Sequence, residues 1–179
     1  MLLSASFVLS SSSCEREKDE SLDDKLSLER VDYNGNELRI DGYFCRYNYV
    51  NKEPEPHGVT PYILYRNGII LGDVGVTADR ISEMEENFKN GFYASNSKKY
   101  YWGVFQINGD KIKYEKWVAG DPPMWAFTYE GVILNNTTFV INKYYRMADM
   151  NKKAPKEVYW EYHFKQFNPK PDSTNRFIP

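Results

Sequence analysis

The fold class of this chain is decided by the segment Val158-Tyr159-Trp160-Glu161-Tyr162-His163-Phe164-Lys165. Every second side chain from Val158 to Phe164 is apolar or aromatic, and the positions between them carry side chains that tolerate water. Successive side chains of a β-strand point to opposite faces, so this segment has one apolar and one wet face. The pattern predicts an antiparallel strand that covers a core on one side.

Similar apolar-aromatic runs precede this segment, and three tight turns connect pairs of them. The turns are Asn67-Gly68, Asn108-Gly109-Asp110 and Asn135-Asn136, which are residue types that accept the positive φ of a short hairpin. All other connections are long. The predicted strands are Leu38–Tyr47, Tyr62–Arg66, Ile69–Val74, Tyr100–Ile107, Lys111–Val118, Trp125–Leu134, Thr137–Met147 and Val158–Phe167.

The connection after the third run contains the one helical pattern in the chain. Ile81, Met84 and Phe88 fall on one face of a helix that Asn90-Gly91 can end. Every second connection of a meander lies at the same end of the barrel. The alternation of tight turns and long loops therefore places the tight turns at one end, which we call the base, and the long loops at the other, which we call the mouth. We therefore predict an all-β, eight-stranded antiparallel up-and-down meander barrel, with one short helix between the third and fourth strands. The same runs can also build a sandwich or an open half-barrel.

Three segments carry a resemblance to known proteins: Asp41-Gly42-Tyr43, Tyr101-Trp102-Gly103-Val104-Phe105-Gln106-Ile107 and Tyr129-Glu130-Gly131-Val132-Ile133-Leu134. Together with the strand count and the loop lengths, they resemble the lipocalin-like, or calycin-like, group and small lipoproteins of Bacteroidota-type bacteria. The resemblance covers about Leu38 to Phe167. It implies a lipocalin-like barrel that binds a small apolar or amphipathic ligand at its mouth, without a cofactor.

Aromatic side chains near the predicted mouth are the candidate ligand contacts. Met124 and Trp125 follow Pro122-Pro123 at the edge of a mouth loop, and tyrosine hydroxyls can orient a polar group in an apolar cavity. The alternative is that the aromatics fill the barrel. The protein would then be a surface interaction module that contacts a glycan or a partner protein through its long loops. The predicted ligand-binding residues are Tyr62, Tyr100, Trp102, Met124, Trp125, Tyr145, Trp160 and His57.

The sequence contains no pattern typical of catalysis, metal binding or nucleic-acid binding. Nucleophile, phosphate-binding and zinc-protease motifs are absent, so we predict a protein that is not an enzyme and has no catalytic residue. The two histidines, His57 and His163, do not stand at metal-ligand spacing from Cys45, so no metal site is predicted. A net charge of -2 argues against nucleic acid as a partner. We predict a monomer.

The first residues of the chain read as a targeting signal. A short apolar stretch and four serines, Ser10 to Ser13, precede Cys14 and a charged run. The stretch is shorter than the roughly 20 residues that span a bilayer, but it suits a signal peptide. The order of these features resembles the lipobox of bacterial lipoproteins, in which the cysteine is acylated, typically with palmitate, and becomes the mature N-terminus.

This resemblance implies a lipid anchor on Cys14 and a location at the bacterial outer membrane, facing the periplasm or the cell surface. The membrane is then a partner through the anchor. Lys18-Asp19-Glu20 resembles the export signal of surface lipoproteins. The predicted organisation is a signal peptide at 1–13, a flexible charged tether at 14–36, the barrel domain at 37–168 and a C-terminal tail at 169–179.

Overall fold

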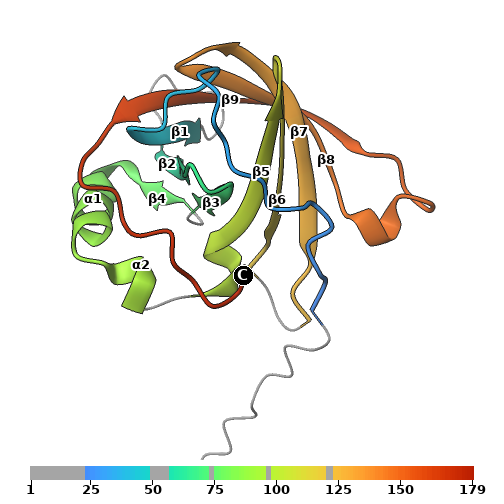
Figure 1. Ribbon diagram of the computed structural model, residues 1–179, viewed down its shortest axis with the longest axis horizontal. Coiled ribbons are helices and arrows are strands. Elements are labelled where there is room, and N and C mark those ends of the chain that lie inside the picture. Colours follow the sequence, from blue (N-terminus) through green and yellow to red (C-terminus); the bar gives the residue numbers. More distant parts are fainter. Residues whose placement is uncertain (1–22, 49–56, 73–74, 96–97, 120–122) are drawn as a thin grey trace, which may run out of the picture.

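A closed antiparallel β-barrel forms the body of the protein (Figure 1). The computed structural model describes residues 23–48, 57–72, 75–95, 98–119 and 123–179. The predictions for the signal peptide, for Cys14 and for Lys18-Asp19-Glu20 lie outside these residues. The described strands are β1 (Gly42–Asn48), β2 (Gly58–Leu64), β3 (Ile69–Gly72), β4 (Val76–Thr77), β5 (Trp102–Asn108), β6 (Lys111–Trp117), β7 (Ala126–Asn135), β8 (Thr138–Tyr145) and β9 (Lys156–Gln166).

Eight of these strands follow one another around the barrel in chain order. The ring runs β1-β2-β3-β5-β6-β7-β8-β9, every pairing is antiparallel, and β9 pairs with β1 to close it. The two-residue β4 lies beside the start of β2 and outside this ring. The predicted eight-stranded meander barrel is therefore confirmed.

The tight turns of the base form at the predicted positions. Gly68 and Gly109 adopt φ values of +76° and +60°, in a region that glycine enters without the steric cost of a Cβ atom. The structure differs at β2, which begins at Gly58 rather than at the predicted Tyr62. Pro61 lies between the residues of β2 that pair with β4 and those that pair with β3. Its missing N–H therefore breaks no ladder bond to either of these two strands.

The helical turns lie outside the barrel. A 3-10 turn (Ala78–Arg80) leads into α1 (Ile81–Lys89), as predicted between the third and fourth predicted strands, and α2 (Phe92–Ser95) follows. Met84 and Phe88 are buried, and Gly91 ends α1 with a φ of +68°. Further 3-10 turns are Lys99–Tyr101 and Met147–Asp149. Among the described residues, no helix has both the length and the apolar character needed to cross a membrane.

Two hydrophobic clusters occupy the two faces of the barrel wall. The inner cluster draws on all eight ring strands, and the outer cluster lies beneath α1, α2 and the C-terminal residues. Neighbouring residues such as Tyr43 and Phe44 belong to different clusters, as strand alternation requires. Buried members of the inner cluster include Phe44, Tyr62, Leu64, Ile70, Phe105, Ile112, Tyr114, Tyr129, Phe139, Ile141 and Tyr162.

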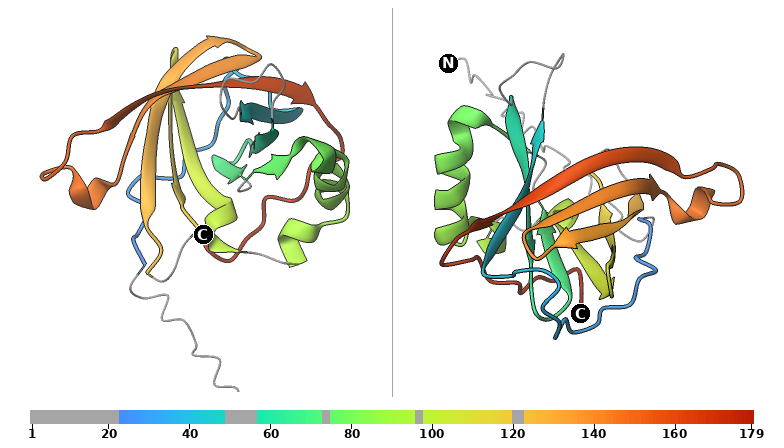
Figure 2. Two further views of the ribbon diagram at one scale, coloured as in Figure 1. Left: turned by 180° about the vertical axis from the view of Figure 1, so that it is seen from behind. Right: turned by 90° about the horizontal axis from the view of Figure 1, so that it is seen from above.

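Residues 23–36 pack against the barrel, which corrects the prediction of a flexible tether over this part of the chain. The segment runs along the outside of β5, β6 and β7 (Figures 1 and 2). The backbone N–H of Asp24 donates to the Met124 carbonyl at 2.9 Å, and Tyr33 is buried in the inner cluster. The charged composition of the segment suggested a solvated tether. In the structure its carboxylates instead bind N–H groups and cationic side chains of the barrel. The tail at 169–179 also packs back, with Ile178 buried in the outer cluster.

Candidate ligand-binding site

The seam between β1 and β9 opens part of the way along the barrel. The two strands pair from Gly42 opposite Gln166 to Cys45 opposite His163. Beyond Cys45, β1 continues to Asn48 beside β2 alone, and the first part of β9 pairs with β8 alone. The barrel wall is therefore closed by main-chain hydrogen bonds near its base and is split near its mouth.

A cleft of about 590 Å³ lies at this split. Its volume falls within the range of roughly 300–1,000 Å³ that is typical of ligand pockets. Because strand alternation directs Arg46 and Trp160 inward and Tyr47 and Tyr159 outward, the cleft passes from the outer surface to the barrel interior. The lining residues are Arg46, Tyr47, Asn48, Tyr159, Trp160, Glu161 and His163.

Stacked aromatic rings continue from the cleft into the barrel. The rings of Trp160 and Tyr144 stack with their centres 5.2 Å apart, and Tyr144 stacks on Tyr129 at 5.8 Å. Tyr129 then stacks on Tyr114 at 4.6 Å, and Tyr114 contacts Tyr62 at 5.5 Å. Trp160 and Tyr144, the outermost rings of this stack, are half-buried, and their flat aromatic surfaces suit an apolar or planar molecule.

Two polar groups in this region are buried without a hydrogen-bond partner among the described residues. One is the Nε of Arg46, whose guanidinium carbon lies 4.4 Å from the centre of the Trp160 ring. The other is the hydroxyl of Tyr114, a residue with 0% exposure. The rings of Tyr62 and Tyr162 lie nearby, but neither hydroxyl meets the geometry of a hydrogen bond with that of Tyr114. Buried polar groups are rarely left unpaired, so both groups can accept a partner.

A second cation faces the same interior. Lys116 is buried, and its Nζ donates to the Gly72 carbonyl at 2.9 Å and lies 5.1 Å from the centre of the Tyr62 ring. By the strand register, none of the inward-facing positions on the described strands carries Asp or Glu. The mouth half of the interior is therefore positively charged and favours a ligand with a negative or strongly polar end.

The tyrosines of the interior are held in their neutral form. Burial away from water raises the pKa of Tyr114 and of Tyr162 well above the ordinary value. Burial also raises the pKa of Tyr62, and the positive charge of Arg46 partly offsets that effect. Neutral hydroxyls both donate and accept hydrogen bonds, so they can orient a polar group without a net charge of their own.

The base half of the barrel is filled by side chains. Phe105, Phe139 and Ile141 are fully buried, and the rings of Phe139 and Tyr162 stack 4.7 Å apart. Close packing of this kind leaves no room for a ligand. Any binding inside the barrel is therefore confined to the half that the split seam opens.

Two of the sequence-predicted ligand-binding residues face this interior. Tyr62 lies in the inner cluster, and Trp160 lines the cleft. Trp102 is buried in the outer cluster, against which Tyr100 and Met124 also pack. These three side chains therefore lie on the opposite side of the wall from the cleft.

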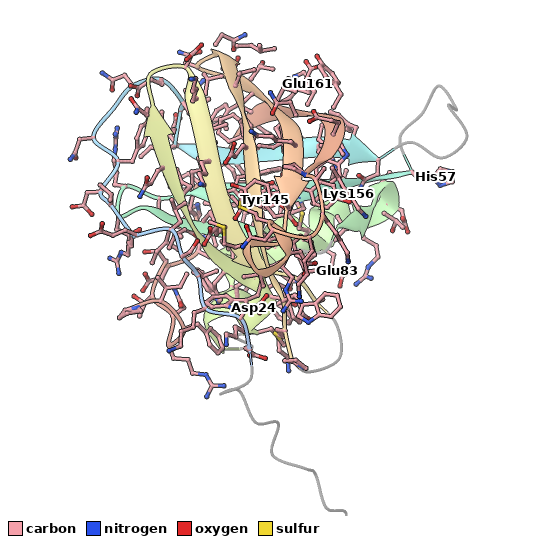
Figure 3. All side chains as sticks on the ribbon, turned by 90° about the vertical axis from the view of Figure 1, so that its right-hand side faces the viewer. Asp24, His57, Glu83, Tyr145, Lys156 and Glu161 are labelled. Atoms are coloured by element: carbon pink, nitrogen blue, oxygen red, sulfur yellow. The ribbon has the colours of Figure 1, made fainter. Side chains whose placement is uncertain are left out.

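The remaining three predicted residues do not line the cleft, although the backbone N–H of His57 donates to the carbonyl of the lining residue Asn48 at 2.8 Å. The Tyr145 hydroxyl donates to the Glu130 carboxylate at 2.7 Å on the outer face, where burial, and then this carboxylate, raises its pKa to about 12. Trp125 is 50% exposed beneath the guanidinium of Arg146, at 4.7 Å. His57 lies at the margin of the molecule, well separated from Tyr145 in Figure 3.

The sequence analysis missed Arg46, Lys116, Tyr114 and Tyr129. Alternation from Phe44 would have placed Arg46 inward, and alternation along β6 would have placed Tyr114 beside Lys116 on one face. These polar and basic residues do not stand out in a search for apolar periodicity. The signal that could have identified the site is a basic residue at an inward-facing position of a predicted strand.

Other features of the described residues do not add chemistry to the site. A second groove, of about 490 Å³, lies on the outer face between residues 23–30 and the C-terminal residues, and it does not reach the interior. In the described part of the chain, no group of three or more His, Cys, Asp and Glu residues could hold a metal ion. Burial raises the pKa of the Cys45 thiol, which keeps it protonated.

Comparisons with known proteins leave the family open. No protein-family profile matches the chain, no curated protein is significantly similar to it, and no solved structure matches it significantly. The fold itself, an eight-stranded antiparallel barrel with a short helix, is consistent with the calycin-like resemblance.

Proposed function

We propose that this protein is a lipid-anchored binding protein that holds a small amphipathic ligand in the mouth half of its barrel. A β-barrel of this kind is compatible with small-ligand binding. The observation that carries the proposal is the split between β1 and β9, where a cleft of about 590 Å³ is lined by Arg46, whose buried Nε has no hydrogen-bond partner among the described residues. The anchor is proposed from the sequence around Cys14.

The chemistry of the interior favours a ligand with two parts. Its apolar or planar part would lie against the stacked rings of Trp160, Tyr144 and Tyr129. Its anionic or polar end would meet Arg46, with the Tyr114 hydroxyl as a further hydrogen-bond partner. Charge-assisted hydrogen bonds to guanidinium groups are among the stronger ones in proteins, so Arg46 would dominate the selection.

The experiment is native mass spectrometry of protein purified from its own host, followed by thermal shift with paired compounds. Each pair would consist of an aliphatic or aromatic carboxylic acid and its neutral amide. We expect a bound small molecule and stabilisation by acids. Arg46→Gln should weaken acid binding by about tenfold or more and leave amide binding nearly unchanged, since a charge-assisted hydrogen bond contributes about 1.5–3 kcal/mol.

The matched control is Arg39→Gln. Arg39 also lies 4.4 Å from an aromatic ring, that of Phe164, but it is exposed near the base and away from the cleft. Binding should be unaffected in this variant. No bound molecule together with no thermal shift across the panel would refute ligand binding.

A surface interaction module is the second candidate function. The filled base half of the barrel and the exposure of Trp125 favour it. In that case the aromatic residues of the interior serve packing alone, and Arg46→Gln would change no binding property. The lipid anchor is tested separately: a high-salt wash should release Cys14→Ala from the membrane fraction and leave the wild type bound, because salt screens charge-dependent contacts and does not remove an acyl chain.

A further inference from the structure

The β8–β9 hairpin extends beyond the barrel and carries an exposed apolar surface at its tip. Its projection is visible at the right of Figure 1 and in the right-hand view of Figure 2. Four apolar side chains at this end of the molecule are between 38% and 50% exposed. We define the hairpin patch as Val118, Trp125, Met147 and Met150 together with Lys152, Lys153 and Lys156.

Backbone hydrogen bonds and one ring contact connect all of these residues except Lys156. The backbone N–H of Val118 donates to the Trp125 carbonyl at 2.9 Å. The Arg146 guanidinium lies 4.7 Å from the Trp125 ring, and Met147 follows Arg146 in the chain. The N–H of Met150 donates to the Met147 carbonyl at 3.2 Å, and those of Lys152 and Lys153 donate to the Asp149 carbonyl.

The patch is basic in a chain that is acidic overall. Residues 143–156 contain five basic residues and one acidic residue, Asp149, whereas the whole chain has a net charge of -2. Lys143 pairs with Glu130 and Arg146 with Asp24, and Lys153 lies 3.7 Å from Asp149. Lys152 adds exposed positive charge two residues after Met150, and the exposed Lys156 has its Nζ 5.7 Å from the centre of the Tyr144 ring. A surface of this composition is complementary to a partner whose outer surface is negatively charged and whose interior is apolar.

The N-terminal part of the chain joins the barrel beside this patch. The Asp23 carboxylate accepts a hydrogen bond from the Met124 N–H at 2.6 Å, immediately before Trp125. Cys14 precedes Asp23 by nine residues. A fully extended chain of that length spans about 30 Å, so an anchor on Cys14 would hold a membrane within that distance of the patch.

We propose that the hairpin patch docks on an anionic lipid surface. Trp125 would lie at the level of the lipid headgroups, where tryptophan is enriched in membrane proteins. Met147 and Met150 would enter the acyl boundary, and the lysines would contact negative headgroups. The inference deepens the proposed membrane location and is separable from it, because docking needs no acyl chain.

The test uses the full chain with Cys14→Ala, so that no lipid on the protein contributes. Co-sedimentation is measured with vesicles of phosphatidylcholine alone and of phosphatidylcholine with an equal part of phosphatidylglycerol. We expect binding to the anionic vesicles that falls as salt rises. Lys152→Glu with Lys153→Glu, and separately Met147→Ser with Met150→Ser, should each weaken this binding by about tenfold or more.

The matched control changes the same residue types at the other end of the barrel. Leu134 is 54% exposed at the base, and Lys111 is exposed beside it at the start of β6. Leu134→Ser with Lys111→Glu should leave vesicle binding unchanged. Equal loss in this control and in the patch variants would overturn the proposal, as would equal binding to both vesicle types or binding to neither.

Tryptophan fluorescence supplies a second readout. Trp102 and Trp117 are buried, and Trp160 is half-buried against Arg46, whereas Trp125 is 50% exposed. A blue shift on addition of anionic vesicles should therefore come mainly from Trp125 and should disappear in Trp125→Phe. A shift that persists in this variant contradicts docking through the patch. If the protein is a dimer in solution and the double variant Met147→Ser with Met150→Ser is a monomer, the patch binds a second copy of the chain instead of a membrane. Membrane fractionation of wild type against Cys14→Ala after a high-salt wash tests the anchor independently.

Discussion

The guanidinium carbon of Arg46 lies 4.4 Å from the centre of the Trp160 ring, at a level where the strands that carry these residues have ceased to pair. Side-chain stacking therefore spans the seam where main-chain hydrogen bonds do not. Stacking of this kind contributes about 0.5–2 kcal/mol, much less than a continuous ladder. The seam is the part of the barrel wall at which a ligand can enter with the least disruption of structure.

Removing the Tyr114 hydroxyl should stabilise the protein without ligand. Because this buried hydroxyl has no hydrogen-bond partner in the described part of the chain, Tyr114→Phe should raise the free energy of unfolding by about 1 kcal/mol. Tyr145→Phe is the matched control, because its hydroxyl donates to Glu130, and it should lower the same quantity by about 1 kcal/mol. Urea denaturation measures both. A loss of stability in Tyr114→Phe would mean that the hydroxyl is paired, for instance with water.

Glu115 should hold residues 23–30 on the barrel. Its carboxylate is 2% exposed and accepts hydrogen bonds from the backbone N–H groups of Ser27 and Leu28, at 2.6 and 2.9 Å, and from the Ser27 and Thr128 hydroxyls, at 2.7 and 2.9 Å. Glu115→Gln places an NH₂ group against these donors, so we expect the free energy of unfolding to fall by about 2 kcal/mol or more.

Hydrogen exchange locates this effect. The amides of Ser27 and Leu28 should exchange faster in Glu115→Gln, while those of the base hairpins remain protected. Thr128→Val, which removes one of the four hydrogen bonds, should show a smaller change of the same kind. Uniform acceleration across the barrel would indicate that Glu115 supports the whole fold rather than this segment.

The ion pair between Asp24 and Arg146 should make stability depend on pH in the acid range. The hydrogen bond from Arg146, at 2.6 Å, lowers the pKa of Asp24. A carboxylate with a lowered pKa stabilises the fold above its unfolded pKa of about 3.9, and this contribution is lost as pH falls through the folded pKa. Asp24→Asn should therefore be less stable than wild type at pH 7 by about 1 kcal/mol, with a difference that shrinks in acid.

The control for this pair is Asp149→Asn, since Asp149 lies 3.7 Å from Lys153, whose side chain is 75% exposed. Its stability should match that of wild type at all pH values within error. Chemical denaturation across the pH range measures the three proteins together. A difference between wild type and Asp24→Asn that does not change with pH would contradict an electrostatic origin.

Lys170 should lose its proton near pH 8, well below the ordinary range of a lysine. Burial lowers its pKa from 10.5 to about 8, and its Nζ donates to the carbonyls of Ile40 and Leu64. Below about pH 8 both folded and unfolded states carry the proton. Between the folded and unfolded pKa values only the unfolded state keeps it, so wild type should gain stability relative to Lys170→Met as pH rises. Titration of the ¹³C-methylated lysine by NMR measures the pKa directly, and a midpoint near 10.5 would contradict the burial.

The strands and turns were predictable from the sequence because their causes are local. The alternation from Val158 to Phe164 depends on the pleat of a single strand, and Gly68 and Gly109 are required by the φ values of their own turns. The number of strands and the alternation of loop lengths then favoured a meander barrel over a sandwich or an open half-barrel. Closure followed because an open sheet of this length leaves exposed edges.

The candidate site was predictable only in part, because it depends on where distant strands separate. Trp160 was recognised as an inward aromatic residue, but its stacking with Arg46 requires β1 and β9 to meet at one register and to part beyond Cys45. Likewise, the packing of residues 23–36 depends on Glu115, a residue of β6.

The sequence by itself therefore determined the strands, the turns, the helix and the class of fold. Only the tertiary structure decided where the barrel splits, which cations face inward and which terminal residues pack against the wall. The physical reason is that alternation and turn conformation are set by the covalent geometry of a few neighbouring residues. The register and separation of strands far apart in sequence are set by the sum of many weak contacts around the whole barrel.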